Sequence, residues 1–188
     1  MRDTATFYNA SLVSAGCCAD VHEWDFSPVT LGVPFTSYTL SAFIFVEQMS
    51  PGADFLNFGQ SDTLPRTTTF EDFLEFRTTP TGTIELGEHG APNWSSVIGS
   101  TPLTESQWHS VAATKDSSGN VKLYLDGVED ASGTIDRSIS PNMKLATARR
   151  RLIPDSLCFI GQLAHVAVDN VVWTAEQVAA QHVFHLAS

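Results

Sequence analysis

Short apolar segments alternate with clusters of glycine, proline, asparagine, aspartate and serine along most of this chain. Residues 37–47 carry the clearest pattern, in which every second residue is apolar: Tyr38, Leu40, Ala42, Ile44 and Val46. Because side chains alternate between the two faces of a strand, this set would occupy one face, and Phe43 and Phe45 the other. Apolar residues on both faces predict a central strand that is covered on both sides.

Residues 108–115 and 121–126 predict two further strands, which a polar turn joins into a hairpin. In the second of these strands, one face is apolar and the other is expected to be wetter: Val121, Leu123 and Leu125 against Lys122, Tyr124 and Asp126. Asp126-Gly127 suits a two-residue turn in which both residues have positive φ. A return strand should therefore start at Val128.

Other short strands are predicted at 55–59, 70–77, 83–87, 97–98 and 161–168. The segment Thr79-Pro80-Thr81-Gly82 has the residue types of a hairpin connection between the second and third of them. Many short strands separated by turn residues are typical of an antiparallel sandwich. We therefore predict an all-β fold of two antiparallel sheets.

One short helix is predicted near the C-terminal end. Thr174 and Gln177 have the spacing of a capping box, in which the Thr174 hydroxyl accepts from the amide of Gln177 and the Gln177 side chain reaches back. Val178 and Ala179 begin a short apolar stripe behind this cap.

Three fragments follow one another in an order that resembles a known family: Trp108-His109-Ser110-Val111-Ala112, Leu123-Tyr124-Leu125-Asp126-Gly127 and Gly161-Gln162-Leu163. They are similar to the Trp-His strand, the Asp-Gly hairpin and the closing strand of laminin-G-like domains in the concanavalin A-like lectin/glucanase superfamily. The resemblance extends over residues 35–182 and implies a jelly-roll sandwich. It also implies binding rather than catalysis, since the family includes glycan binders, calcium-dependent adhesion modules, spacer domains and parts of viral particles.

We expect a single domain. A β-sandwich of 188 residues is common as one unit with one core. Residues 35–188 would form the laminin-G-like sandwich. Residues 1–34 would form an N-terminal arm and the first strands, packed on the sandwich or on a neighbour.

The charge of the chain disfavours a nucleic-acid partner. Its formal net charge is −11, which would repel a phosphate backbone over most of the surface. We interpret the basic run Arg149-Arg150-Arg151 as a solvated turn. The apolar runs are too short for a helix that crosses a bilayer, so no membrane insertion is expected.

Calcium is the one cofactor that the resemblance suggests, and the sequence disfavours it. Ala164 and His165 stand where the family commonly carries acidic residues, whereas Ca²⁺ needs roughly six to eight oxygen ligands. The acidic residues of other loops are scattered and are interpreted as solvated: Asp54, Asp62, Asp116, Asp130 and Asp169. We therefore expect no metal and no other cofactor.

The histidines and cysteines point to structural roles. His109 and His165 lie on predicted strands beside apolar neighbours, and their ring nitrogens are expected to find hydrogen-bond partners within the sandwich. His182 and His185 share a face of the predicted helix, which we expect to be solvated or at an interface. The cysteines form an odd set that predicts reduced thiols: Cys17, Cys18 and Cys158.

The best candidate for ligand binding is the segment 87–94, which is expected to be a loop with a shallow sugar site. His89 and Asn93 would supply hydrogen bonds, and the indole of Trp94 could stack on a pyranose ring. The alternative is that Trp94 folds back over the edge of the sandwich. The other tryptophans are expected in the core or covering an edge: Trp24, Trp108 and Trp173.

No catalytic site is predicted. Glucanases of this fold carry paired carboxylates on one strand, but Glu23-Trp24-Asp25 lacks the second glutamate, and Glu71 and Glu75 would share a face with Phe73 between them. A Gly-x-Ser-x-Gly nucleophile elbow is also absent from the sequence. We expect the protein not to be an enzyme.

The N-terminal segment does not resemble a cleavable signal peptide, because Asp3 adjoins the basic Arg2 and polar residues interrupt a short apolar stretch. An adhesion-type fold without an evident leader, with both chain ends held by neighbours, favours a non-enzymatic structural protein on a virion surface. It would form a homo-oligomer, perform capsid decoration and contact host glycans. The alternative is a carbohydrate-binding, lectin-like module outside the cell or on its surface, and a glycoside hydrolase comes third.

Overall fold

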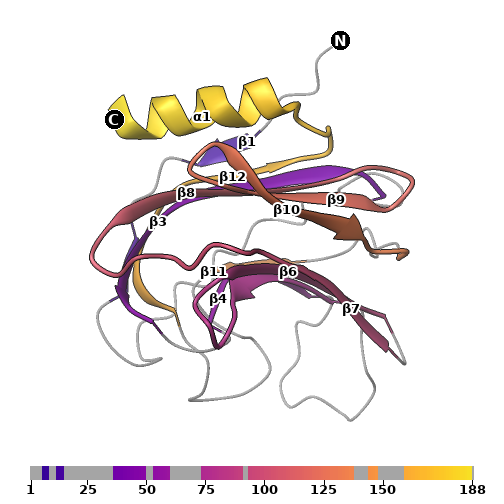
Figure 1. The fold of residues 1–188 in the computed structure, drawn as a ribbon, viewed down its shortest axis with the longest axis horizontal. Helices are drawn as coiled ribbons and strands as arrows, with labels where there is room; N and C mark the ends of the chain where they lie inside the picture. Colours follow the sequence, from indigo (N-terminus) through magenta and orange to yellow (C-terminus); the bar gives the residue numbers. More distant parts are fainter. Residues whose placement is uncertain are drawn as a thin grey trace.

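A computed structural model of the chain describes residues 6–8, 12–14, 36–49, 53–59, 73–90, 93–137, 144–147 and 159–187. Over these residues it contains two antiparallel sheets stacked face to face, and one helix, α1 (Ala175–Ala187), on the outer side of one sheet (Figure 1). The all-β sandwich predicted from the sequence is confirmed.

The larger sheet has seven strands within the described residues. Their bounds are β1 (Thr6–Tyr8), β2 (Leu12–Ser14), β3 (Tyr38–Gln48), β8 (Trp108–Lys115), β9 (Asn120–Leu125), β10 (Val128–Thr134) and β12 (Ile160–Asp169). The order is β1-β12-β3-β8-β9-β10, and β2 also pairs with β12. The prediction that residues 1–34 form an N-terminal arm and the first strands of a single domain stays a prediction, and most of those residues lie outside the described ranges.

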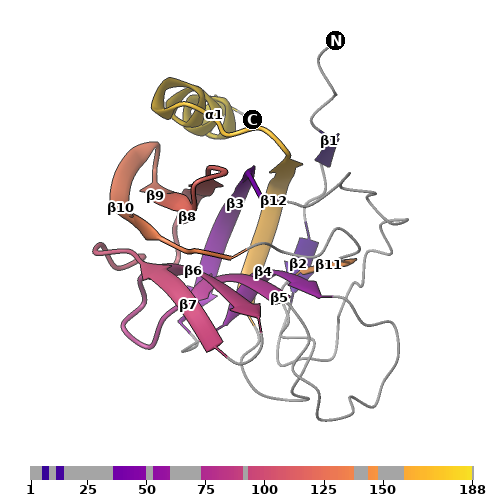
Figure 2. The ribbon, with the colours of Figure 1, turned by 90° about the vertical axis from the view of Figure 1, so that its right-hand side faces the viewer.

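The smaller sheet has five strands within the described residues, in the order β11-β4-β5-β6-β7. Their bounds are β4 (Asp54–Gly59), β5 (Phe73–Thr78), β6 (Ile84–Gly90), β7 (Asn93–Ile98) and β11 (Lys144–Thr147). This sheet lies on the opposite side of the larger sheet from α1 (Figure 2). Its outer face is therefore not covered by the helix.

The main core lies between the two sheets. The alternating apolar set predicted for β3 is buried there, from Tyr38 to Val46. The smaller sheet contributes buried residues from β5 and β6: Leu74, Phe76, Ile84 and Leu86. The edge-to-face contact between Phe55 and Phe76, with ring centroids 4.6 Å apart, shows close packing within this layer.

One buried ion pair crosses this core. Lys115 of β8 lies 2.7 Å from Glu88 of β6, and the Tyr38 hydroxyl donates to the same carboxylate. Burial raises the pKa of Glu88, and the ammonium of Lys115 opposes that effect. The pair joins the two sheets and fixes their relative position.

A second, smaller core lies between the larger sheet and α1. Its members are Ala112, Tyr124, Ala167, Trp173 and Val178. The prediction that Tyr124 lies on a wetter face is therefore wrong, because α1 covers that face of β9. The indole N–H of Trp173 donates to Asp169 at 2.8 Å, and this bond holds the segment that leads into the helix.

The local turn and cap predictions are confirmed. Asp126 and Gly127 have φ values of 51° and 79°, as the two-residue hairpin turn requires. The amide of Thr174 donates to Gln177 Oε1 at 2.8 Å and the amide of Gln177 donates to the Thr174 hydroxyl at 3.3 Å, which completes the capping box.

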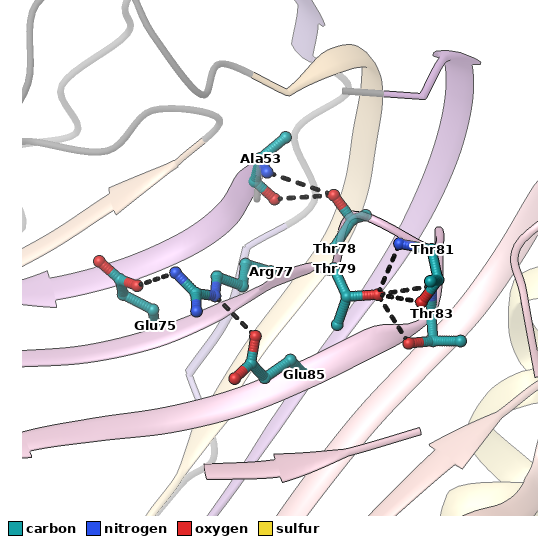
Figure 3. A network of polar contacts seen from close by, with 8 residues as sticks. All are labelled: Ala53, Glu75, Arg77, Thr78, Thr79, Thr81, Thr83 and Glu85. Atoms are coloured by element: carbon teal, nitrogen blue, oxygen red, sulfur yellow. Dashed lines mark hydrogen bonds and ion pairs between the residues drawn. The ribbon is translucent and has the colours of Figure 1, made fainter. Parts of the chain in front are cut away.

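The connection between β5 and β6 is a threonine-rich turn (Figure 3). The Thr79 hydroxyl oxygen lies 2.9 Å from that of Thr81 and 2.8 Å from that of Thr83. Gly82 adopts a φ of 80°, which favours glycine at this position. The turn fixes the register of the two strands, and thereby the cross-strand neighbours described next.

Candidate functional site on the outer face of the smaller sheet

Polar and aromatic side chains gather on the outer face of the smaller sheet. In β5, Glu75 and Arg77 alternate with core residues, so they point away from the core. The register places Arg77 opposite Glu85, and Glu75 opposite Gly87. Side chains from two neighbouring strands are thereby brought together on one rigid surface.

Arg77 forms two ion pairs on this face (Figure 3). Its Nη1 lies 3.0 Å from Glu75 Oε2, and its Nε lies 2.9 Å from Glu85 Oε2. The exposed fraction of the side chain is 18% for Arg77, but 0% for Glu75 and 6% for Glu85. The two carboxylates are buried and hold a partly accessible guanidinium in place.

Trp94 of β7 lies across the neighbouring strand β6. A Cβ atom added to Gly87 would stand 1.9 Å from Cζ2 of the indole, so a residue with a side chain at this position would displace the ring. The guanidinium carbon of Arg77 lies 4.8 Å from the centroid of the Trp94 ring, within the range of a cation–π interaction. We call Glu75, Arg77, Glu85 and Trp94 the Trp94–Arg77 cluster.

The structure places the predicted sugar-site residues at the end of the β6–β7 hairpin. His89 is the cross-strand partner of Trp94, and Gly90 is the partner of Asn93. The side chain of Asn93 lies outside the described residues. The prediction of a loop at 87–94 is wrong, since most of this segment belongs to two strands. Trp94 folds back over the sheet, as the alternative hypothesis expected.

Arg77 and Glu85 were not predicted from the sequence as site residues, and Glu75 was considered only as a catalytic residue. A signal was present, however. Once 79–82 is recognised as a hairpin connection, antiparallel pairing places residue 77 opposite residue 85. Opposite charges at paired positions would then have indicated an ion pair on one face.

His109 has the structural role that was predicted. Its Nδ1 lies 2.9 Å from Asp126, and the amide of Thr104 donates to its Nε2 at 3.1 Å. The hydrogen bond that this imidazole donates to the Asp126 carboxylate raises its pKa. His165 lies on a strand, β12, as predicted. Its ring stacks on that of His185, with ring centroids 5.2 Å apart.

His185 is not solvated, because it is 2% exposed and lies on the side of α1 that packs against the larger sheet. Its ring stacks on Phe43 at 4.9 Å, and its Nδ1 lies 3.1 Å from the Ser110 hydroxyl. Gln181 lies 2.8 Å from Nε2. Burial, followed by the proximity of His165 and His182, lowers the pKa of His185 to about 4. The solvated-face interpretation is therefore wrong for this residue.

Three of the acidic loop residues are structural rather than merely solvated. Asp116 accepts from the amides of Ser118 and Asn120 within its turn. Asp130 accepts from the amides of Ser100 and Thr101. The third is Asp169, which accepts from the indole N–H of Trp173. Asp62 and the side chain of Asp54 lie outside the described residues.

No metal site emerges from the part of the chain that the structure describes: it contains no group of three or more His, Cys, Asp or Glu that could hold a metal ion. The described helix is also not long and apolar enough to cross a membrane. The predicted cysteine chemistry and the run at 149–151 concern residues outside the described ranges, as does Trp24.

Trp173 is buried, as predicted, but the prediction for Trp108 is wrong. Trp108 is 37% exposed on the central strand β8. Its indole stacks on Phe43, with ring centroids 4.6 Å apart, and contacts Phe45 at 5.5 Å. It therefore lies on the outer face of the larger sheet rather than in the core or at an edge.

The sequence profile of the concanavalin A-like lectin/glucanases superfamily matches residues 25–179, and the chain belongs to this family. A comparison with curated protein sequences finds no match. Members of the family share the sandwich, and the fold alone does not specify a ligand.

Several solved structures are similar in fold. The CBM40 of the Ruminococcus gnavus IT-sialidase, bound to α2,3 sialyllactose, has a TM-score of 0.75 at 10% identity and covers 92% of this chain and 96% of its own. Domain 4 of the extracellular GH43 arabinanase AbnA from Geobacillus stearothermophilus, in complex with arabinotriose, has a TM-score of 0.63 at 20% identity, over 81% and 69%. The heptameric SAP-like pentraxin of Limulus polyphemus has a TM-score of 0.58 at 15% identity, over 77% and 68%.

Proposed function

We propose that this protein is a non-catalytic carbohydrate-binding module that binds a glycan on the outer face of its smaller sheet. The observation that carries the proposal is the Trp94–Arg77 cluster, in which an indole lies along a sheet and is held there by an ion-paired arginine. An aromatic ring fixed on a rigid element suits the apolar face of a sugar ring, and neighbouring polar groups suit its hydroxyls.

The geometry supports binding better than catalysis. Both carboxylates of the cluster are buried and engaged by Arg77, so neither is presented as a nucleophile or as a general acid. The face is therefore arranged to hold a ligand rather than to cleave it.

The fold neighbours also favour this function over the virion-surface hypothesis. Two of them were solved with bound sugars, one with α2,3 sialyllactose and one with arabinotriose. Their likeness to this chain supports the sugar-binding alternative. A location on a virion, a location outside the cell, capsid decoration and a homo-oligomeric state remain predictions.

The test is a glycan array with the full chain, followed by calorimetric titration of the glycans that bind. Trp94→Ala should weaken binding by about tenfold or more, which corresponds to about 1.4 kcal/mol. Trp108→Ala is the matched control, because it removes a partly exposed indole from the other sheet. If Trp108→Ala abolished binding and Trp94→Ala did not, the site would lie on the other face and the proposal would be wrong.

A further inference from the structure

The charge of the Trp94–Arg77 cluster carries an inference about the kind of sugar that it accepts. We infer that the ligand is an uncharged sugar chain rather than an acidic one, an inference that rests on the proposed function. Within the cluster, Arg77 is the residue that would attract a carboxylate or a sulfate. Its existing contacts indicate whether its guanidinium is available to such a group.

The charge of Arg77 is already paired with two carboxylates. Two of its N–H groups donate to Glu75 and Glu85, at 3.0 and 2.9 Å, and its guanidinium carbon lies over the Trp94 ring at 4.8 Å from the ring centroid. Recognition of a carboxylate by arginine depends on the same planar fork of N–H donors. An acidic sugar that approached the same guanidinium would be placed beside two buried carboxylates of like charge.

The local charge balance points the same way. The cluster holds one guanidinium and two carboxylates, so its formal charge is −1 when all three are ionised. Arg77 is the only lysine or arginine in the strands β4, β5, β6 and β7, while Lys144 begins β11 at the opposite edge of the sheet. The whole chain adds to this negative potential, with a net charge of −11.

An uncharged sugar avoids this electrostatic cost. It loses no ionic hydration on binding, and it stacks on the indole without competing for the fork of Arg77. The two glutamates are therefore positioning residues for Arg77 and Trp94, and they also determine specificity by cancelling the charge of the arginine.

The experiment compares sugars that share a scaffold and differ in charge. Lactose is paired with 3′-sialyllactose, and methyl-esterified oligogalacturonate with oligogalacturonate, on an array and then in titrations at 50 and 500 mM NaCl. The expected result is that the uncharged members bind at least tenfold more tightly, with affinities that change less than twofold with salt. Tighter, salt-sensitive binding of an acidic member would overturn the inference while leaving the proposed function intact. Binding of no glycan at all would overturn both.

A variant tests the role of the glutamates directly. Glu85→Gln removes one negative charge but keeps a hydrogen-bond acceptor for Arg77, so the affinity for the acidic sugars should rise by about fivefold to tenfold. The matched control is Glu129→Gln, which removes the same charge from an exposed pair with Lys122 on the larger sheet. Circular dichroism and thermal melts of both variants establish that each is folded. No gain in Glu85→Gln, or an equal gain in Glu129→Gln, would contradict the inference.

Discussion

The two outer faces of this sandwich are built from the same alternation of strand residues but have different partners. On the larger sheet, small and aromatic residues such as Ala112 and Tyr124 meet α1 and form a second core. On the smaller sheet, the outer positions of β5 and β6 carry Glu75, Arg77 and Glu85, and the helix lies elsewhere (Figure 2). The alternation of side chains along a strand determines which residues point away from the core. The types of those residues determine whether a helix packs on that face or whether the face remains open to a ligand.

The polar groups on the two faces follow the same division. Between α1 and the larger sheet, the His185 ring is hydrogen-bonded to the neutral side chains of Ser110 and Gln181. Its lowered pKa keeps it neutral at pH 7. On the smaller sheet, the buried carboxylates pair with a guanidinium that is partly in contact with solvent. The face covered by the helix therefore holds neutral polar groups and the half-open face holds ions, while the core between the sheets also contains the buried ion pair of Lys115 and Glu88.

The largest effect should come from the covered face. Trp173→Ala removes a buried indole between α1 and the larger sheet, together with its hydrogen bond to Asp169. We expect a loss of about 3–5 kcal/mol in the free energy of unfolding, measured by urea denaturation. Trp94→Ala on the half-open face should cost roughly 1–2 kcal/mol. Equal losses would show that the two faces are equally important for stability.

A smaller effect is expected from breaking the ion cluster. Arg77→Met takes the guanidinium away from two buried carboxylates, and it should cost about 2–3 kcal/mol, below the range for fully buried pairs because Arg77 is partly exposed. Lys122→Met breaks an exposed pair with Glu129 and should leave the free energy of unfolding nearly unchanged. Urea denaturation at pH 7 measures both. Similar losses in the two variants would mean that burial of the carboxylates does not increase the contribution of the ion pairs to the free energy of unfolding.

Much of the fold could be predicted because its determinants are local. The turn at Asp126-Gly127 and the cap at Thr174 depend on residues within a few positions of each other, and both are found as predicted. The burial of Tyr124 and His185 could not be predicted in the same way. It depends on where α1 packs, and no local pattern states which sheet face a terminal helix will cover.

Only part of the candidate site could be predicted, because some of its residues become neighbours only through the pairing of strands. Trp94 and His89 were recognised from their residue types, although their segment was expected to be a loop. Arg77 and Glu85 become neighbours only through the register of a hairpin, which has to be assigned before the ion pair can be seen. The position of Trp94 over Gly87 requires the three-dimensional arrangement of β6 and β7.

A further effect depends on pH and concerns His185. Its pKa is lowered to about 4 in the folded state and is about 6.5 in the unfolded state, so between these values the unfolded chain binds the extra proton. Stability from this group is therefore complete above pH 6.5 and is lost as the pH falls towards 4. At pH 5 the loss relative to pH 8 should be about 2 kcal/mol.

Two variants separate this effect from other titrations. His185→Phe keeps a ring between Phe43 and His165 but cannot be protonated, so its stability should fall less steeply between pH 8 and pH 5 than that of the unmodified protein. His109→Gln should do the opposite. The pKa of His109 is raised by Asp126, so this residue stabilises the fold at low pH, and its removal should steepen the decline. Urea denaturation at pH 5, 6, 7 and 8 measures these slopes, and identical slopes in the two variants would refute the assignment of the pH dependence to the histidine beneath α1.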